Sequence, residues 1–184
     1  MTEQVLSEQI RNNVENPKMT NFLQSARRLF DESVKTLREV IKVVDTRHKG
    51  LYEKVFSSCS DCLIALRFVK YDPSEQGSLL AKAHYDRSAC TLAVAESAPG
   101  LRIGRDESSL KEVARHGNTV IFFPSFTFAS ALGSNEFAPG WHDVIQQSGH
   151  SYSKGVARWS IILFTDVKSD EVISYEDAHT PQNY

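Results

Sequence analysis

Short runs of β-forming residues follow one another through the second two-thirds of this chain, and they limit its fold more than any other feature. Examples are Cys62 to Tyr71, Cys90 to Glu96 and Val156 to Val167, and turn residues such as Ala98-Pro99-Gly100 separate neighbouring runs. Many short strands at close spacing are typical of a sandwich, a barrel or a jelly roll. Strands do not alternate with helices in the way that parallel βαβ units require. The sequence therefore predicts a mainly β fold after about residue 60.

The first 60 residues have a helical pattern instead. From Thr20 to Val44, apolar residues recur at steps of three and four, and charged residues occupy the opposite face. This period predicts a long amphipathic helix that buries one stripe. We expect residues 1–60 to form an N-terminal helical segment that packs on the outside of a sheet, and residues 61–184 to form the core of a single compact domain.

Composition limits the classes of partner. The chain has 184 residues, 41% of them hydrophobic and 24% charged, which suits one globular domain. Its net charge of -2 gives no reason to expect nucleic acid or an anionic membrane as a partner. The first residues lack the basic region and apolar run of a secretory signal, and no apolar run approaches the length of a bilayer span. We therefore expect a cytoplasmic protein and leave its oligomeric state open.

The cysteines give a weaker signal. Cys59, Cys62 and Cys90 are few and odd in number, which favours reduced thiols in a cytoplasmic protein. Cys59 and Cys62 form a C-x-x-C pair, but a single pair without a second one is a poor indication of zinc. We interpret both as reduced cysteines at the entrance of a strand.

One short segment has the residue types of a metal site. In an extended strand, residues two apart point to the same face, so His84 and Asp86 present an imidazole and a carboxylate together. A second histidine from a distant strand would complete two histidines and one carboxylate, the ligand set typical of non-haem Fe(II) oxygenases. The second histidine is either His142 or His150. His142 lies in an alternating, strand-like run and His150 in a turn-like one, so His142 is the better candidate.

A second pair of residues favours binding of a carboxylate. Arg158 and Ser160 are also two apart, so on a strand they share a face. The planar guanidinium donates two parallel hydrogen bonds to a carboxylate, and the hydroxyl adds another donor. Their neighbour Trp159, and Trp141 beside His142, are expected to point the other way, into a core beneath the long helix.

These motifs together resemble the 2-oxoglutarate/Fe(II)-dependent dioxygenases of the isopenicillin N synthase-like branch. The resemblance covers about residues 62–167 and keeps the motifs in family order. It is carried by Leu66 to Pro73, Ala83 to Asp86, Thr91-Leu92, Pro99 to Leu101, Trp141 to Val144 and Arg158 to Ser160. Two positions depart from the family: Pro124-Ser125 stands where a Gly-Asp pair is usual, and Asp143 stands where an arginine is common. The chain is also short for this branch.

The resemblance implies a double-stranded β-helix, the jelly-roll or cupin-like fold. It also implies Fe(II) bound by His84, Asp86 and His142. 2-Oxoglutarate would be the co-substrate, with its carboxylate on Arg158 and Ser160 and the Tyr71 hydroxyl helping to position it.

Three hypotheses for function follow from these residues. The first is an enzyme that uses O2 and 2-oxoglutarate to oxidise, by default to hydroxylate, a small-molecule substrate, with release of succinate and CO2. The second is a catalytically silent binding or sensor protein that retains the metal and 2-oxoglutarate site, because a fold alone does not establish activity. The third keeps catalysis but replaces 2-oxoglutarate with another carboxylate-bearing substrate.

Overall fold

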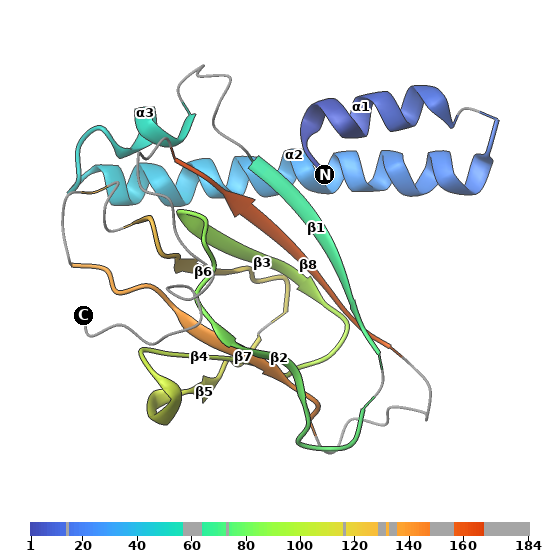
Figure 1. Ribbon diagram of the computed structural model, residues 1–184. Helices are drawn as coiled ribbons and strands as arrows, with labels where there is room; N and C mark the ends of the chain where they lie inside the picture. The colour runs from blue at the N-terminus through green and yellow to red at the C-terminus, as the bar shows by residue number, and fades with distance from the viewer. Residues whose placement is uncertain are drawn as a thin grey trace.

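A computed structural model describes residues 1–13, 15–56, 64–72, 74–115, 117–128, 132, 136–147 and 157–167. Two layers of strands face each other, and helices lie along one side of them (Figure 1). Within these ranges, no helix combines the length and the apolar composition that crossing a bilayer requires. Cys59, Cys62 and His150 fall outside the described residues. Cys90 is a buried free thiol, and burial raises its pKa to about 12.

The described part of the N-terminal segment contains three helices. They are α1 (Glu3–Asn12), α2 (Pro17–Asp45) and α3 (Leu51–Phe56). The sequence pattern places the start of the second helix near Thr20, but α2 begins three residues earlier. Asn16 is its N-cap, because the side-chain oxygen accepts a hydrogen bond from the Met19 amide at 3.2 Å. Pro17 fits the first helical turn, where its missing N–H costs nothing.

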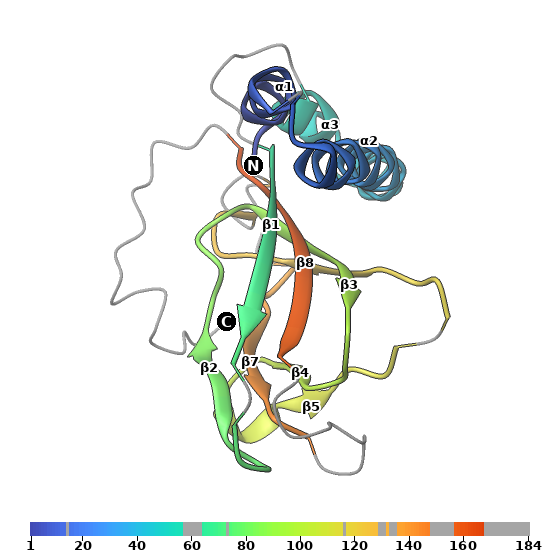
Figure 2. The same ribbon diagram turned by 90° about the vertical axis from the view of Figure 1, so that its right-hand side faces the viewer.

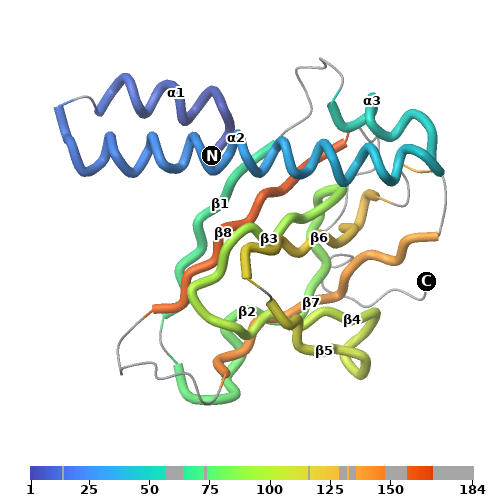
Figure 3. Tube along the Cα trace, turned by 180° about the vertical axis from the view of Figure 1, so that it is seen from behind, coloured from blue at the N-terminus to red at the C-terminus, as the bar shows by residue number. Residues whose placement is uncertain are grey.

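One apolar stripe of α2 is buried against one of the two sheets. The stripe and the sheet residues form one apolar cluster, which includes Leu23, Ala26, Phe30, Leu37 and Ile41 of the helix and Leu66, Leu92 and Leu163 of the strands. Seen from behind, α1 and the start of α2 extend beyond the sheets (Figure 3). The rest of α2 therefore anchors the helical segment to the sheet.

Within the described residues, the strands form two antiparallel sheets of four. They are β1 (Ile64–Tyr71), β2 (Leu79–His84), β3 (Cys90–Glu96), β4 (Leu101–Gly104), β5 (Lys111–Glu112), β6 (Ile121–Pro124), β7 (Trp141–Ile145) and β8 (Arg158–Thr165), with a 3-10 helix η1 (Glu107–Ser109) between β4 and β5. One sheet has the order β1-β8-β3-β6 and the other β2-β7-β4-β5. Consecutive strands thus tend to alternate between sheets, which is the jelly-roll arrangement (Figure 2). The prediction of a mainly β jelly roll is confirmed.

The connection from β3 to β4 carries the chain from one sheet to the other. It turns at Gly100, whose φ of +139° lies in a region that side-chain-bearing residues rarely adopt. A Cβ there would stand 2.3 Å from the carbonyl oxygen of Ile145. Since the Gly100 carbonyl also accepts a hydrogen bond from the Ile145 amide at 2.9 Å, the crossover lies directly against β7.

Neither tryptophan beside the candidate site residues packs beneath the long helix. Trp159 is 47% exposed, which contradicts the prediction. The apolar cluster under α2 includes Ile161 and Leu163 of β8 but not Trp159, so the helix does not cover this end of the strand. Trp141 is buried as predicted, but it lies in the second sheet with its ring centroid 4.8 Å from that of Tyr85.

A truncation in the α2 stripe should destabilise the fold. Leu37 is fully buried, so Leu37→Ala should lower the free energy of unfolding by about 2–5 kcal/mol through lost burial and the cavity left behind. Urea unfolding measures the change. The matched control is Val43→Ala on the same helix, where the side chain is 70% exposed and the change should stay within about 0.5 kcal/mol. Equal effects at the two positions would contradict the packing.

Candidate metal centre

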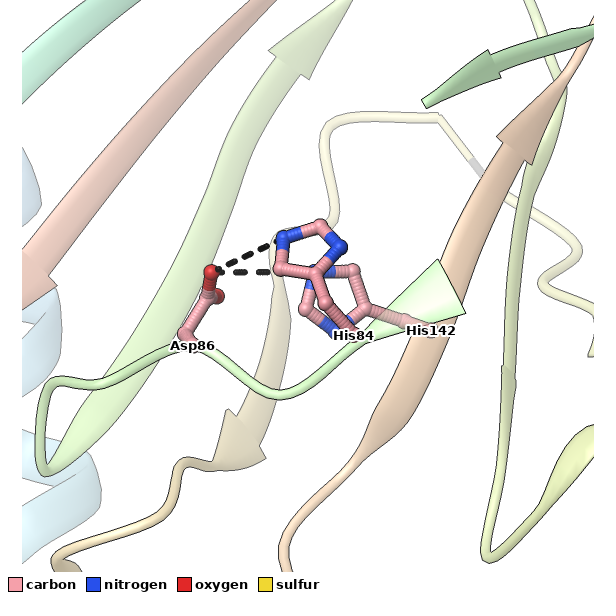
Figure 4. A group of neighbouring side chains, drawn as sticks. All are labelled: His84, Asp86 and His142. Atoms are coloured by element: carbon pink, nitrogen blue, oxygen red, sulfur yellow. Dashed lines mark ion pairs between the residues drawn. The ribbon is translucent and has the colours of Figure 1, made fainter. Parts of the chain in front are cut away.

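His84, Asp86 and His142 converge between the two sheets (Figure 4). Each offers one ligand atom, and these atoms all lie within 4.8 Å of one another. His84 ends β2, His142 lies on the adjacent β7, and the two are Cα partners across the ladder. Asp86 follows two residues after His84, beyond the end of the strand. The structure thus brings together the three residues that the sequence singles out as metal ligands.

Irregular pairing of β2 with β7 sets this register. Leu79 pairs with Ile145, Ala81 with Val144 and His84 with His142, so the step from Ala81 to His84 spans three residues while β7 advances by two. An extra residue of this kind is a β-bulge, which re-aims the side chains that follow. The bulge brings the two imidazoles to the same face, with ring centroids 4.3 Å apart.

Backbone carbonyls orient both imidazoles. The Nδ1 atom of His84 lies 2.7 Å from the carbonyl oxygen of Lys82, and Nδ1 of His142 lies 2.9 Å from that of Gly140. Because a carbonyl oxygen can only accept, each Nδ1 must carry the hydrogen. In the neutral ring, the lone pair is then on Nε2. Both Nε2 atoms face Oδ1 of Asp86, at 3.6 Å from His84 and 3.7 Å from His142.

Two hydroxyl groups hold the carboxylate. Thr91 Oγ1 donates a hydrogen bond to Oδ2 of Asp86 at 2.6 Å, and Ser125 Oγ lies 2.8 Å from the same Thr91 oxygen. Since the single Thr91 proton goes to the carboxylate, Ser125 is the donor to Thr91. The chain from Ser125 to Thr91 to Asp86 leaves Oδ1 toward the histidines. It assigns a use to Ser125, one of the two positions that depart from the family pattern.

The three groups shift one another's pKa values in different directions. Burial disfavours protonation of His84, but Asp86 and the Lys82 carbonyl together raise its pKa above the usual range. Burial dominates at His142 and lowers its pKa. Burial alone would raise the pKa of the Asp86 carboxyl, but His142, His84 and Thr91 outweigh it and lower the value. The centre therefore favours an ionised carboxylate beside a neutral His142.

This donor set fits a divalent transition metal. Two ligand atoms about 2.1 Å from a common ion lie about 3 Å apart at right angles and at most about 4.2 Å apart. The distances of 3.6 and 3.7 Å from Asp86 Oδ1 to the two Nε2 atoms are therefore compatible with one ion. Two neutral imidazoles and one carboxylate on one face are the set found in non-haem Fe(II) sites that keep open positions. The Nδ1–H···O=C bonds and the Thr91 hydroxyl supply the outer contacts that such ligands usually have.

Arg158, Ser160 and Tyr71 form a second group on the sheet that contains β1 and β8. The Arg158 guanidinium is buried; Nη1 donates to Ser160 Oγ at 2.6 Å, and Nε donates to the Ala98 carbonyl at 3.1 Å. The Tyr71 ring centroid lies 5.2 Å from the guanidinium carbon. Burial raises the pKa of the Tyr71 phenol, and the charges of both Arg158 and Asp86 act on it. Tyr71 is therefore close enough to both the Arg158 guanidinium and the Asp86 carboxylate for their charges to affect its phenol.

Sequence reasoning missed one member of this group, Glu96. Its carboxylate forms an ion pair with Arg158, 2.9 Å between Nη2 and Oε1, and both side chains are buried. Glu96 ends an apolar strand just before a turn, where an acidic residue normally faces solvent. A buried guanidinium is strongly destabilising without a negatively charged partner. The expected burial of Arg158 was therefore the available signal for an acidic residue close to it.

Asp143, the residue after His142, forms an ion pair with Arg102 and is not one of the three candidate metal ligands. Asp143 accepts two hydrogen bonds from Arg102, from Nε at 2.8 Å and from Nη2 at 2.5 Å. The two residues are Cα partners on β7 and β4. Alternation along β7 turns Asp143 away from His142, so this departure from the family pattern joins strands of the second sheet.

Comparisons with known proteins agree with this fold. No family model and no curated protein sequence matches the chain. Among solved structures, a provisionally assigned oxygenase from Shewanella oneidensis matches with a TM-score of 0.65 and 20% identity, over 89% of this chain and 62% of that one. A full-length Neurospora crassa protein in complex with alpha-KG and 5-formyluracil matches with a TM-score of 0.64 and 19% identity, over 83% and 51%.

A third structure, JOX2 in complex with 2OG, Fe and JA, matches with a TM-score of 0.61 and 17% identity, over 84% of this chain and 44% of that one. At such identities the likeness shows a shared fold. The chain spans less than two thirds of the length of each of these proteins.

Removing the Thr91 hydroxyl should weaken metal binding while leaving the fold intact. Thr91→Val deprives Asp86 of its 2.6 Å donor, and the loss of such an outer contact typically lowers metal affinity about 10–100-fold. Calorimetric titration with Mn²⁺ measures the change. Thr127→Val is the matched control, since its buried hydroxyl has no hydrogen-bond partner in the described part of the chain. Unchanged affinity in Thr91→Val would contradict the role assigned to this hydroxyl.

Proposed function

We propose that this protein is an Fe(II)- and 2-oxoglutarate-dependent dioxygenase that oxidises a small molecule. The observation that carries the proposal is the convergence of two imidazole Nε2 atoms and one carboxylate oxygen on a jelly roll whose other sheet contains the buried, hydrogen-bonded Arg158 and Ser160. Among solved structures of the same fold, one holds 2OG and Fe and another holds alpha-KG. The order of the motifs in the sequence supports a further part of this proposal, that the chain belongs to the isopenicillin N synthase-like branch.

In this proposal the residues have distinct tasks. His84, Asp86 and His142 hold the metal, and Thr91 fixes the orientation of the carboxylate. Bound Fe(II) supplies the redox chemistry in which O2 converts 2-oxoglutarate to succinate and CO2 and oxidises the substrate.

The acid-binding group completes the assignment. Arg158 and Ser160 take the distal carboxylate of 2-oxoglutarate, because a guanidinium beside a hydroxyl suits an acid group. The Tyr71 ring packs against the Arg158 guanidinium, and its hydroxyl is proposed to help position the oxo acid.

The substrate is proposed to be a small molecule. The side chains of His142 and Asp86 are 8% and 10% exposed and that of His84 is 27% exposed, so the centre opens to solvent mainly at His84, which favours a compact ligand over a macromolecular surface. 5-Formyluracil in the Neurospora crassa structure and JA in JOX2 are ligands of that size class. A cytoplasmic location without nucleic-acid or membrane partners stays a prediction from composition.

The alternative is a catalytically silent binding protein that retains the metal and 2-oxoglutarate site, because a fold and its ligand set do not by themselves establish turnover. Succinate release against a broad substrate panel separates the two functions, since a silent binder releases none although it binds the metal and the oxo acid.

Replacing Arg158 should weaken 2-oxoglutarate binding without loss of the metal. Anaerobic addition of Fe(II) and 2-oxoglutarate should produce a weak visible charge-transfer band, and Arg158→Lys should raise the 2-oxoglutarate concentration needed for half of the band about tenfold or more. Lysine keeps the charge but loses the planar fork. Arg28→Lys, on the exposed face of α2, is the matched control. A wild-type protein that gives no band, or an Arg158→Lys variant that behaves like wild type, would contradict the proposed function.

A further inference from the structure

The ion pair between Glu96 and Arg158 arises from a β-bulge in the other sheet, between β3 and β8. β3 and β8 pair Ala93 with Ile162, Ala95 with Ile161 and Glu96 with Ser160, so β3 has one more residue than β8 between the first two pairs. Without this extra residue, alternation would turn Glu96 to the opposite face. The bulge directs its carboxylate to the same side as Ser160.

Glu96 already balances the charge of the acid-binding group. The Glu96 and Arg158 side chains are 7% and 1% exposed, so water screens the pair little. Of the five guanidinium N–H groups, Nε bonds the Ala98 carbonyl, Nη1 bonds Ser160, and Nη2 bonds Glu96. The two remaining N–H groups have no partner within the described residues. Arg158 can therefore still donate hydrogen bonds to a ligand, but its positive charge is already paired.

We propose that Glu96 is a resident counter-ion that makes this site discriminate poorly between a negative and a neutral distal group on its oxo-acid ligand. The inference rests on the proposed function and extends it to the specificity of the acid-binding group. An incoming carboxylate gains attraction from Arg158 and meets repulsion from Glu96 at comparable range. In a buried site these opposing interactions are of similar size and largely cancel. A neutral carboxamide or ester gains the remaining hydrogen bonds without that repulsion.

Glu96 also contributes to the stability of the fold. An unpaired guanidinium in this position would be strongly destabilising, because buried charges need a partner. Glu96 supplies that partner before any ligand enters. The ion pair therefore stabilises the folded protein before a ligand binds, and it lowers the preference of the site for an acid.

A cycle of two ligands and two proteins, wild type and Glu96→Gln, tests this inference, with Glu8→Gln as a control. N-oxalylglycine carries the chelating oxo-acid end and the distal carboxylate of 2-oxoglutarate, and its terminal amide differs only in having a neutral distal group. Both are titrated calorimetrically into Mn²⁺-loaded wild type, Glu96→Gln and Glu8→Gln. Glutamine keeps an oxygen that accepts from Arg158 but removes the charge. Glu8, exposed on α1, is the matched control for loss of one negative charge.

Wild type should prefer the acid over the amide by less than about tenfold, and Glu96→Gln should increase that preference about tenfold or more, a coupling that converts to about 1.4 kcal/mol. Glu8→Gln should match wild type. The same acid preference in wild type and Glu96→Gln, with both proteins binding the acid, would overturn the inference and leave the proposed function standing. No binding of either ligand to any of the three Mn²⁺-loaded proteins would overturn both.

A measurement on the wild type alone keeps the inference testable if Glu96→Gln does not fold. A wild-type preference for the acid of tenfold or more would show that Glu96 leaves the charge of Arg158 available to the ligand, and it would overturn the inference. Thermal unfolding followed by circular dichroism shows which of the variants are folded.

Discussion

The pairing of His84 with His142 across the β2–β7 ladder is the constraint on which the candidate centre depends. The two residues are 58 positions apart in the chain, and the ladder fixes their backbones as Cα partners. Asp86 then needs to be only two residues away from one of them. Because the ligands are attached to sheet structure at His84 and His142, small changes in the loops would leave the two imidazoles in place.

Hydrogen bonds to the three ligand side chains determine which of their atoms face the centre. The Lys82 and Gly140 carbonyls fix the hydrogen on each Nδ1 and so leave each Nε2 as the inward-facing donor to a metal. Thr91 does the same for Asp86 by occupying Oδ2. Asp86 Oδ1 and the two Nε2 atoms are thus selected by their surroundings before any ion binds, which lowers the cost of organising them at binding.

Sequence periodicity predicted those parts of the site that follow regular strand geometry. The two-residue spacing placed Arg158 beside Ser160 correctly, since β8 is regular there, and the Nη1–Oγ distance is 2.6 Å. It also paired His84 with Asp86, although Asp86 lies beyond the strand. The jelly-roll fold was expected from the resemblance, but the order of its strands was not predicted, because local patterns do not specify which strands pair.

The residues that sequence reasoning missed or misplaced depend on irregularities and tertiary cover. The position of Glu96 depends on a bulge between Ala93 and Ala95, and a single inserted residue in a strand leaves no periodic signal. Trp159 was expected to be buried because alternation gives the face on which a side chain lies. Alternation does not give the extent of the helix that covers that face, and α2 does not reach this end of β8.

The charges of the buried groups connect the metal centre to the acid-binding group. Two neutral imidazoles and Asp86 carry one negative charge, and the Arg158–Glu96 pair carries none. A divalent metal and a dicarboxylate would bring equal and opposite charges, so the filled site would keep one net negative charge. If the distal group of the ligand were neutral, the filled site would instead be neutral, which low-dielectric surroundings favour. The negative charge of Glu96 therefore enters the net charge of the whole filled site. With Glu96 present, a ligand with a neutral distal group gives a net charge of zero.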